Sequence, residues 1–343
     1  MSMHAVKVDI FLLNANEFIY GFFIEKNNLH YQSQETNMIH TNKKGDWFEL
    51  AIPAEWESYT LETLFREFWK VPKKLVHQLR LEKNVLINGN VPDWTHHFKK
   101  NDRLSMKLFT EEEATVIPEY LNVDIIYEDD HLIVFNKPAG MDTHPNESGQ
   151  VGTLVNGAAY HMQSNGELTR PRHIHRLDRE TTGAVLFAKN PLMTAIFDKM
   201  LEERAIKRTY LALADGIIRQ KKGTINKPIG RDRHHPTRRR VSETGQQAIT
   251  HFKVLDQMKH KDLTLVQCIL DTGRTHQIRV HFSAIGHPLA GDSLYEGSDT
   301  FHRQALHAVK MEFTHPFTQE KIICHAPFID QPPIFFNIDP YEI

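Results

Sequence analysis

Residues 173–189 hold the pattern in this chain that is best suited to chemistry. Cationic side chains surround a single carboxylate, Asp178, and a run of apolar and β-branched residues follows. Asp178 is therefore expected where a polar loop enters a buried strand, and catalytic groups concentrate on loops that a rigid scaffold holds in place. The positive charges of Arg176 and Arg179 favour an ionised carboxylate, which can act as a nucleophile. For the tripeptide R-L-D alone, a turn-forming or capping aspartate is the commoner role.

The size and composition of the chain limit the class of protein. A length of 343 residues favours two or three domains, and 40% hydrophobic with 24% charged residues is typical of a globular protein. No apolar run reaches the length of a membrane span, and the first nine residues do not resemble a signal peptide. The only cysteines, Cys268 and Cys324, suggest no disulfide framework. We therefore expect a cytoplasmic protein without membrane association.

Positive charge is concentrated in one segment although the whole chain carries a net charge of −2. Residues 201–240 contain twelve Lys or Arg and four Asp or Glu, a local net charge of +8. Such a cluster attracts phosphates whatever the charge of the whole chain. A solvated face or a flexible loop is the alternative interpretation.

Patterns of apolar residues divide the chain into four parts. Residues 1–57 form an N-terminal extension with strand-like segments at 6–13, 18–24 and 47–53. Residues 58–110 predict two helices, the first capped by Thr60, and then a small hairpin. Residues 111–118 are typical of a linker.

The fourth part, residues 119–343, is predicted to be one large α+β domain. Helices are expected at 153–163 and 191–203. Because strands far outnumber helices and do not alternate with them, a doubly wound parallel sheet is excluded. The expected strands are 125–127, 132–135, 184–188, 210–214, 248–254, 263–270, 277–282 and 309–313.

Five further segments accompany the H-R-L-D-x-x-T-x-G segment around Asp178. They are Y-E-D-D-H-L-I-V-F-N-K-P-A-G-M (127–141), R-A-I-K-R-T-Y-L-A-L (204–213), D-T-G-R-T-H-Q-I-R-V-H (271–281), G-H-P-L-x-G-D (286–292) and R-Q-A-L-H-A (303–308). In this order they resemble the RluA-type family of RNA pseudouridine synthases over roughly residues 120–330. Residues 58–110 resemble the S-four type RNA-binding domain. Several long motifs in fixed order are far more specific than any one of them.

The resemblance implies isomerisation of uridine to pseudouridine within RNA. It also implies a pseudouridine synthase fold with a mixed, mainly antiparallel sheet. By this resemblance Asp178 is the essential carboxylate, attacking the ribose C-1′ or removing a sugar proton to give a glycal. Arg279 is the arginine that pairs with it, and its guanidinium can hold a carboxylate bidentately. Tyr210 stacks on the target uracil, and its hydroxyl can join the proton transfer at C-5.

Three further residues are assigned to substrate binding. By the resemblance, Arg176 enters the space that the flipped nucleotide leaves. Leu306 is expected to line the base pocket, with a core leucine as the alternative. Lys137, in the N-K-P-A-G turn, has a structural role or contacts a phosphate.

No cofactor is implied, and the histidine pairs have neither the spacing nor the partners of a zinc site. The expected partner is structured RNA, ribosomal or transfer, with no obligatory protein partner. Two other functions remain open. A glycosidic-bond hydrolase needs a second carboxylate, for which Glu180 is the nearest candidate. A non-catalytic RNA-binding protein would not need Asp178, Tyr210 and Arg279 together.

This sequence departs from the usual family pattern at a few positions. Thr182 stands where serine is more common, and Met141, Asp142 and Thr143 replace a more apolar stretch. Neither change affects the residues expected to do the chemistry. The unusual first fifty residues leave the identity of the RNA open.

Overall fold

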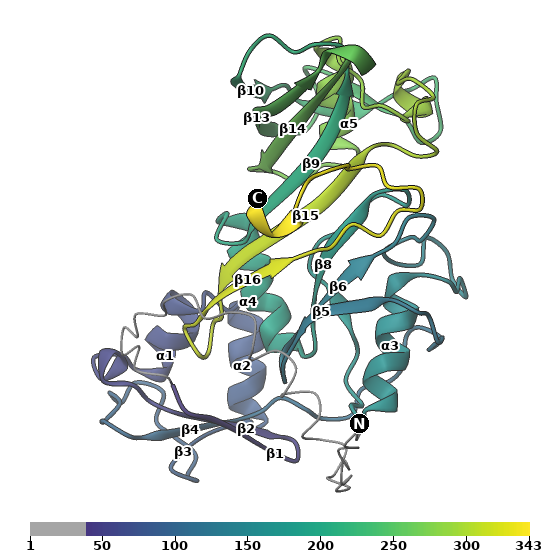
Figure 1. Cartoon of the computed structure of the whole chain (residues 1–343). Coiled ribbons are helices and arrows are strands. Elements are labelled where there is room, and N and C mark those ends of the chain that lie inside the picture. Colours follow the sequence, from purple (N-terminus) through teal and green to yellow (C-terminus); the bar gives the residue numbers. More distant parts are fainter. Residues whose placement is uncertain (1–38) are drawn as a thin grey trace, which may run out of the picture. The chain divides into compact units, whose positions relative to one another are not determined.

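A sheet of ten strands is the main scaffold, and a sheet of four strands precedes it along the chain. The computed structural model describes residues 39–343 (Figure 1). The strands expected at 6–13 and 18–24 lie outside the described residues. The fold is α+β, as the sequence predicts.

The four-stranded sheet, in the order β1-β2-β4-β3, belongs to the small domain. The two expected helices and the β3–β4 hairpin are present, and the Thr60 side chain caps the first helix by accepting from Thr63 N at 3.1 Å. However, β1 and β2 precede residue 58 and still pair within this sheet, so a domain boundary at residue 58 would divide the sheet. The elements are β1 (Thr41–Lys44), β2 (Trp47–Ala51), η1 (Ala54–Trp56), α1 (Leu61–Thr63), η2 (Leu64–Phe68), α2 (Lys73–Leu81), β3 (Val85–Ile87) and β4 (Arg103–Lys107).

The ten-stranded sheet is mixed and mainly antiparallel. Its main path runs β10-β13-β14-β9-β15-β8-β6-β5, with β16 beside β15 and β7 beside β8. Figure 1 shows β9 between β14 and the yellow strand β15. Only the β15–β8 pair among these strands is parallel. The strands are β5 (Asp124–Glu128), β6 (Leu132–Lys137), β7 (Arg172–His173), β8 (Thr182–Ala188), β9 (Lys207–Asp215), β10 (Lys222–Asn226), β13 (Ile249–Met258), β14 (Leu263–Leu270), β15 (Leu306–Thr314) and β16 (Lys321–His325).

Three helices accompany this sheet, and two of them match their predicted positions. They are α3 (Leu154–Ser164) and α4 (Pro191–Glu202), each starting after a polar cap residue as a helix start requires. The strand predicted at 277–282 is wrong, because these residues form the helix α5 (Gln277–Ala284). Every residue from 277 to 282 is buried, so the helix has no polar face that its sequence could reveal.

Shorter elements complete the fold. A separate two-stranded hairpin, β11 (Ile229–Arg231) with β12 (Arg239–Val241), lies against α5. Three short 3-10 turns follow: η3 (Lys259–Lys261), η4 (Ser293–Tyr295) and η5 (Pro340–Glu342). None of the helices in the described part of the chain is long and apolar enough to cross a membrane.

The small domain packs on the turn between β15 and β16. The ring of Phe48 stacks on Phe317 with centroids 5.0 Å apart, and Trp69 Nε1 donates to Pro316 O at 3.2 Å. The linker is also bound to the large domain, because Glu112 accepts a hydrogen bond from Arg170 N at 3.0 Å and forms an ion pair with Arg172. Apolar burial and these buried polar contacts join the two domains.

The start of β8 passes very close to β15. Gly183 adopts φ +113°, and a Cβ at this position would lie 2.3 Å from Ala308 O. Only glycine combines this φ with so close an approach of two backbones. The loop that carries Asp178 ends here, so this contact fixes where the loop leaves the sheet.

We predict that Gly183→Ala lowers the free energy of unfolding by more than about 3 kcal/mol, because the backbones must separate. The matched control is Gly140→Ala, which also has a positive φ, +75°, but an open surrounding. It should cost only about 1 to 2 kcal/mol of backbone strain. Urea unfolding followed by circular dichroism measures both. Equal losses at the two glycines would contradict the close-approach argument.

Candidate active site

Asp178 lies in the loop between β7 and β8, and buried side chains hold the backbone on both sides of it. Thr143 Oγ1 donates to Leu177 O at 3.0 Å and accepts from Leu177 N at 3.1 Å. Lys137 Nζ donates to Arg179 O at 3.0 Å. The Asp178 carboxylate is thereby presented from a loop with little freedom, and its side chain is 16% exposed.

Arg303 anchors the loop after Asp178. Its guanidinium is fully buried, pairs bidentately with Asp330 and donates to Glu180 O at 3.1 Å and to Thr182 Oγ1 at 2.9 Å. A planar guanidinium can hold a carboxylate and neighbouring carbonyls at the same time. The R-Q-A-L-H-A segment thus holds the loop of Asp178 through its arginine, although sequence reasoning gave Arg303 no role.

Arg279 connects Asp178 to a second carboxylate. Its Nη1 donates to Asp178 Oδ2 at 3.1 Å, while Nε and Nη2 donate to the two oxygens of Asp292 at 2.7 and 2.8 Å. The bidentate partner is therefore Asp292 rather than Asp178, and Arg279 reaches Asp178 from a helix rather than a strand. Burial alone would lower the pKa of Arg279, but hydrogen bonds to Asp292 and the charge of Asp178 outweigh it and raise that pKa.

The two arginines that flank Asp178 in sequence, Arg176 and Arg179, do not pair with its carboxylate. Arg179 is exposed and pairs with Asp142 at 3.4 Å and Glu180 at 3.7 Å. Arg176 is exposed at the rim of the pocket. Within residues 39–343, the ion-pair partner of Asp178 is Arg279, and His276 Nε2 lies 3.9 Å from its other oxygen. The arginine that pairs with Asp178 thus comes from 101 positions away in the sequence rather than from the neighbouring residues.

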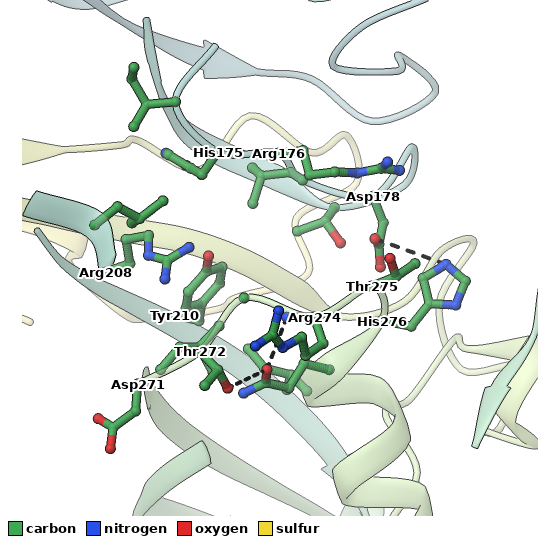
Figure 2. Close-up of a pocket in the computed structure, with 18 of the residues that line it drawn as sticks. His175, Arg176, Asp178, Arg208, Tyr210, Asp271, Thr272, Arg274, Thr275 and His276 are labelled. Carbon is green, nitrogen blue, oxygen red and sulfur yellow. Dashed lines mark hydrogen bonds and ion pairs between the residues drawn. The ribbon is translucent and has the colours of Figure 1, made fainter. Parts of the chain in front are cut away.

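A cavity of about 580 Å³ opens beside Asp178, a size suited to a small ligand or a single flipped nucleotide. In Figure 2, Asp178 approaches this space from the loop between β7 and β8, and Arg208 and Tyr210 approach it from β9. Tyr210 and Leu306 are almost completely buried in its wall. Burial raises the pKa of Tyr210, so its phenol stays protonated at neutral pH.

Lys137 does not fit the phosphate contact considered for it. Its side chain is fully buried, and Nζ donates to the carbonyls of Pro138, Met141 and Arg179 at 2.8, 2.8 and 3.0 Å. An ammonium has three hydrogens, so none remains for a phosphate. Lys137 instead fixes the N-K-P-A-G turn to the loop of Asp178, which is the structural role that the turn pattern favours.

Three other residues of the site carry polar contacts that sequence reasoning did not assign. Asp292 ends the G-H-P-L-x-G-D segment and is 1% exposed. His276 Nε2 lies 3.9 Å from Asp178 Oδ1, and its Nδ1 lies 2.8 Å from the hydroxyl of Tyr295. Asp292 and His276 lie in quoted motifs, which could have flagged them, whereas Tyr295 lies three residues beyond one.

The structure divides the basic segment 201–240. Its first arginines lie at the cavity or pair with acids, as Arg204 does with Asp271 at 3.1 Å. The exposed cations Arg231, Arg233 and Arg240 gather on the β11–β12 hairpin. No group of three or more His, Cys, Asp or Glu among the described residues is arranged to hold a metal ion.

Comparisons with known proteins identify the same two parts of the chain. The family model described as RNA pseudouridylate synthase matches residues 131–284, and the RluD ribosomal pseudouridine synthase N-terminal domain matches residues 48–104. An uncharacterized RNA pseudouridine synthase of Bacillus subtilis is 49% identical over 84% of this chain and 95% of its own length. The ribosomal large subunit pseudouridine synthase D of Nitrosomonas europaea is 41% identical over 64% of this chain and 66% of its own.

A solved structure is similar as well. The human RNA Pseudouridylate Synthase Domain Containing 1 has a TM-score of 0.50 and 27% identity, covering 64% of this chain and 88% of that protein's chain.

We predict that Lys137→Met lowers the free energy of unfolding by about 2 to 4 kcal/mol, since it leaves three carbonyls without their donor. The salt dependence of RNA affinity should not change. A lost phosphate contact would instead reduce the slope of log affinity against log salt by about one. Denaturant unfolding and fluorescence titrations with RNA at several salt concentrations measure the two quantities. Unchanged stability with a reduced slope would restore the phosphate role.

Proposed function

Because the chain belongs to the RNA pseudouridine synthase family, we propose that it isomerises specific uridines of structured RNA with Asp178 as the essential carboxylate. The observation that carries this proposal is the Arg279–Asp178 pair at 3.1 Å, at the wall of a cavity that Tyr210 also lines. The pair limits the orientation of the Asp178 carboxylate, as a nucleophile or base requires.

The proposed reaction breaks the bond from ribose C-1′ to N-1 of uracil and forms a bond from C-1′ to C-5. In one route Asp178 attacks C-1′, and C-5 later displaces the carboxylate. In the other route Asp178 removes the C-2′ proton as the bond to N-1 breaks, which gives a glycal; C-5 then adds to C-1′ as the proton returns from Asp178 to C-2′. In both routes the proton on C-5 leaves at the end. A kinetic isotope effect from deuterium at C-2′ would identify the glycal route.

We assign Tyr210 to holding the uracil ring. Its ring is available for stacking, which stabilises an extruded base by about 1 to 3 kcal/mol. Because burial raises the pKa of Tyr210, a phenolate that takes the C-5 proton is disfavoured at neutral pH. Stacking is therefore its main role in this proposal, and the hydroxyl contributes as a neutral hydrogen-bond partner.

Base flipping brings the uridine into the cavity in this proposal. Arg176 is exposed at the rim, from where its long side chain can enter the space the base leaves. Leu306 lies in the wall with 4% exposure and gives the base an apolar contact. A side chain that replaces the base offsets part of the unstacking cost of a few kcal/mol.

Ribosomal RNA is the first candidate substrate and transfer RNA the second. Support for ribosomal RNA comes from the relative named for the large ribosomal subunit and from the matching N-terminal domain. The small domain and the cations of the β11–β12 hairpin would contact RNA phosphates. Cys268 and Cys324 are buried and free, which suits a reducing cytoplasmic location.

RNA labelled with tritium at uridine C-5 tests the proposed function. The wild-type protein should release tritium to water without freeing uracil, and Asp178→Asn should abolish release while RNA affinity is kept. Glu180→Gln is the matched control, because its side chain is partly exposed and does not line the cavity. It should remain active. If the wild-type protein instead releases free uracil, and both Asp178→Asn and Glu180→Gln lose this release, the protein is a hydrolase that uses two carboxylates.

We also predict that the β11–β12 hairpin binds phosphates. Replacing Arg231 and Arg233 together by Ala should reduce the slope of log affinity against log salt by up to about two, one for each phosphate contact. Replacing Lys259 and Lys261 on η3 removes the same charge from another exposed turn and should leave the slope nearly unchanged. Equal effects of the two double variants would mean that only overall charge matters.

A further inference from the structure

His276 faces the one carboxylate oxygen of Asp178 that Arg279 does not hold. We propose that His276 is a positioning residue whose Nε2–H, directed by Tyr295, fixes Oδ1 of Asp178 when RNA occupies the cavity. This inference rests on the proposed function of Asp178. It gives the Asp178 carboxylate a second hydrogen-bond donor. It also gives Tyr295 a role in positioning His276, although Tyr295 does not line the cavity.

The two oxygens of Asp178 have different neighbours. Oδ2 accepts from Arg279 Nη1 at 3.1 Å, whereas Oδ1 lies 3.9 Å from His276 Nε2. A distance of 3.9 Å is too long for a hydrogen bond, but a shift of about 1 Å would form one. Catalytic hydrogen bonds are often long without substrate and shorten in the complex. His276 also lines the cavity, so a bound nucleotide would press directly on this region.

Tyr295 decides which nitrogen of His276 carries the hydrogen. Its hydroxyl accepts from Arg239 N at 2.9 Å and lies 2.8 Å from His276 Nδ1. A hydroxyl has one hydrogen, and Nδ1 is the acceptor nearest to it among the contacts of the described residues. In this proposal Nδ1 accepts that hydrogen, and the single hydrogen of a neutral imidazole is on Nε2, facing Asp178.

The surroundings keep both rings in these states. Burial raises the pKa of Tyr295 to about 12, so its hydroxyl remains a donor. Burial also lowers the pKa of His276, which favours the neutral ring with a single hydrogen. The charged groups that act on His276 are Asp178 and Asp292, which oppose this shift, and Arg279 and Arg239, which add to it.

The backbone of His276 is in a strained conformation. His276 caps α5 with φ +56° and ψ 24°, the left-handed region, which asparagine tolerates better than histidine. A strained residue at a functional site persists where the surrounding structure determines it. Here the ring of Tyr295 is fixed on both sides, with the Arg279 and Arg238 guanidinium groups 5.0 and 5.5 Å from its centroid.

Two substitutions at His276 separate the donor from the fold. His276→Asn suits the left-handed backbone, so unfolding temperature should not fall, but its short amide cannot reach the place of Nε2. Tritium release in single turnover should fall roughly 10- to 100-fold, as for the loss of one hydrogen bond to a charged group. His276→Gln places an amide N–H near that of Nε2 and should recover most of the rate. RNA affinity should be unchanged in both.

Tyr295→Phe tests the role of the tautomer. Without the hydroxyl the hydrogen of His276 can move to Nδ1, so the variant should also be slow. An amide has no tautomer, so the same change combined with His276→Gln should cause little further loss. Equal rates for the Asn and Gln variants, or an undiminished effect of Tyr295→Phe beside His276→Gln, would overturn the proposal.

A measurement that needs no turnover tests the role of His276 independently of the proposed function. In protein with ¹⁵N-labelled histidine, the signals of His276 are assigned by their loss in His276→Asn. They should report a protonated Nε2 and an unprotonated Nδ1, and Tyr295→Phe should shift them. A protonated Nδ1 in the wild-type protein would overturn the proposal even if the enzyme is active. Absence of tritium release from the wild-type protein would overturn the proposed function instead.

Discussion

The buried guanidinium of Arg279 is the contact on which the rest of the site depends. It forms ion pairs with two carboxylates at once, those of Asp178 and Asp292, at 3.1 and 2.7 Å. One positive and two negative charges leave a net negative charge where a polyanion must bind. The exposed cations of the β11–β12 hairpin and of the cavity rim compensate for this repulsion. The bidentate bond goes to Asp292, so Arg279 contacts only one oxygen of Asp178, through a single hydrogen bond.

The position of Asp178 depends equally on its backbone. Thr143, Lys137 and Arg303 hold the carbonyls of three residues around it, and these anchors come from two distant parts of the chain, residues 137–143 and residue 303. Gly183 then lets the loop end against β15. These contacts explain why the motifs lie far apart in sequence: each supplies one anchor for the same short loop. Because these side chains act on the backbone of the loop, they need no contact with RNA themselves.

Local patterns predicted the positions of most helices and strands, including the fully buried strands β6 and β8. The helices α3 and α4 and most strands of the large sheet lie where apolar periodicity places them. The pattern failed at α5, because residues 277–282 are buried on all sides and Ile278 and Val280 imitate a strand. It also could not assign β1 and β2 to the small domain, since strand pairing across fifty residues leaves no local signal.

The sequence by itself determined the chemistry available: a carboxylate at Asp178, an arginine, a tyrosine and the ordered motifs that surround them. It could do so because motif order and residue type are properties of the chain. Only the tertiary structure decided which charges meet. Arg176 and Arg179 are near Asp178 in sequence but form no ion pair with it among the described residues, whereas Arg279 pairs with it from 101 residues away. Hydrogen bonds depend on direction and distances of about 3 Å, which sequence spacing does not encode. For the same reason the roles of Lys137, Asp292 and His276 became clear only in the folded chain.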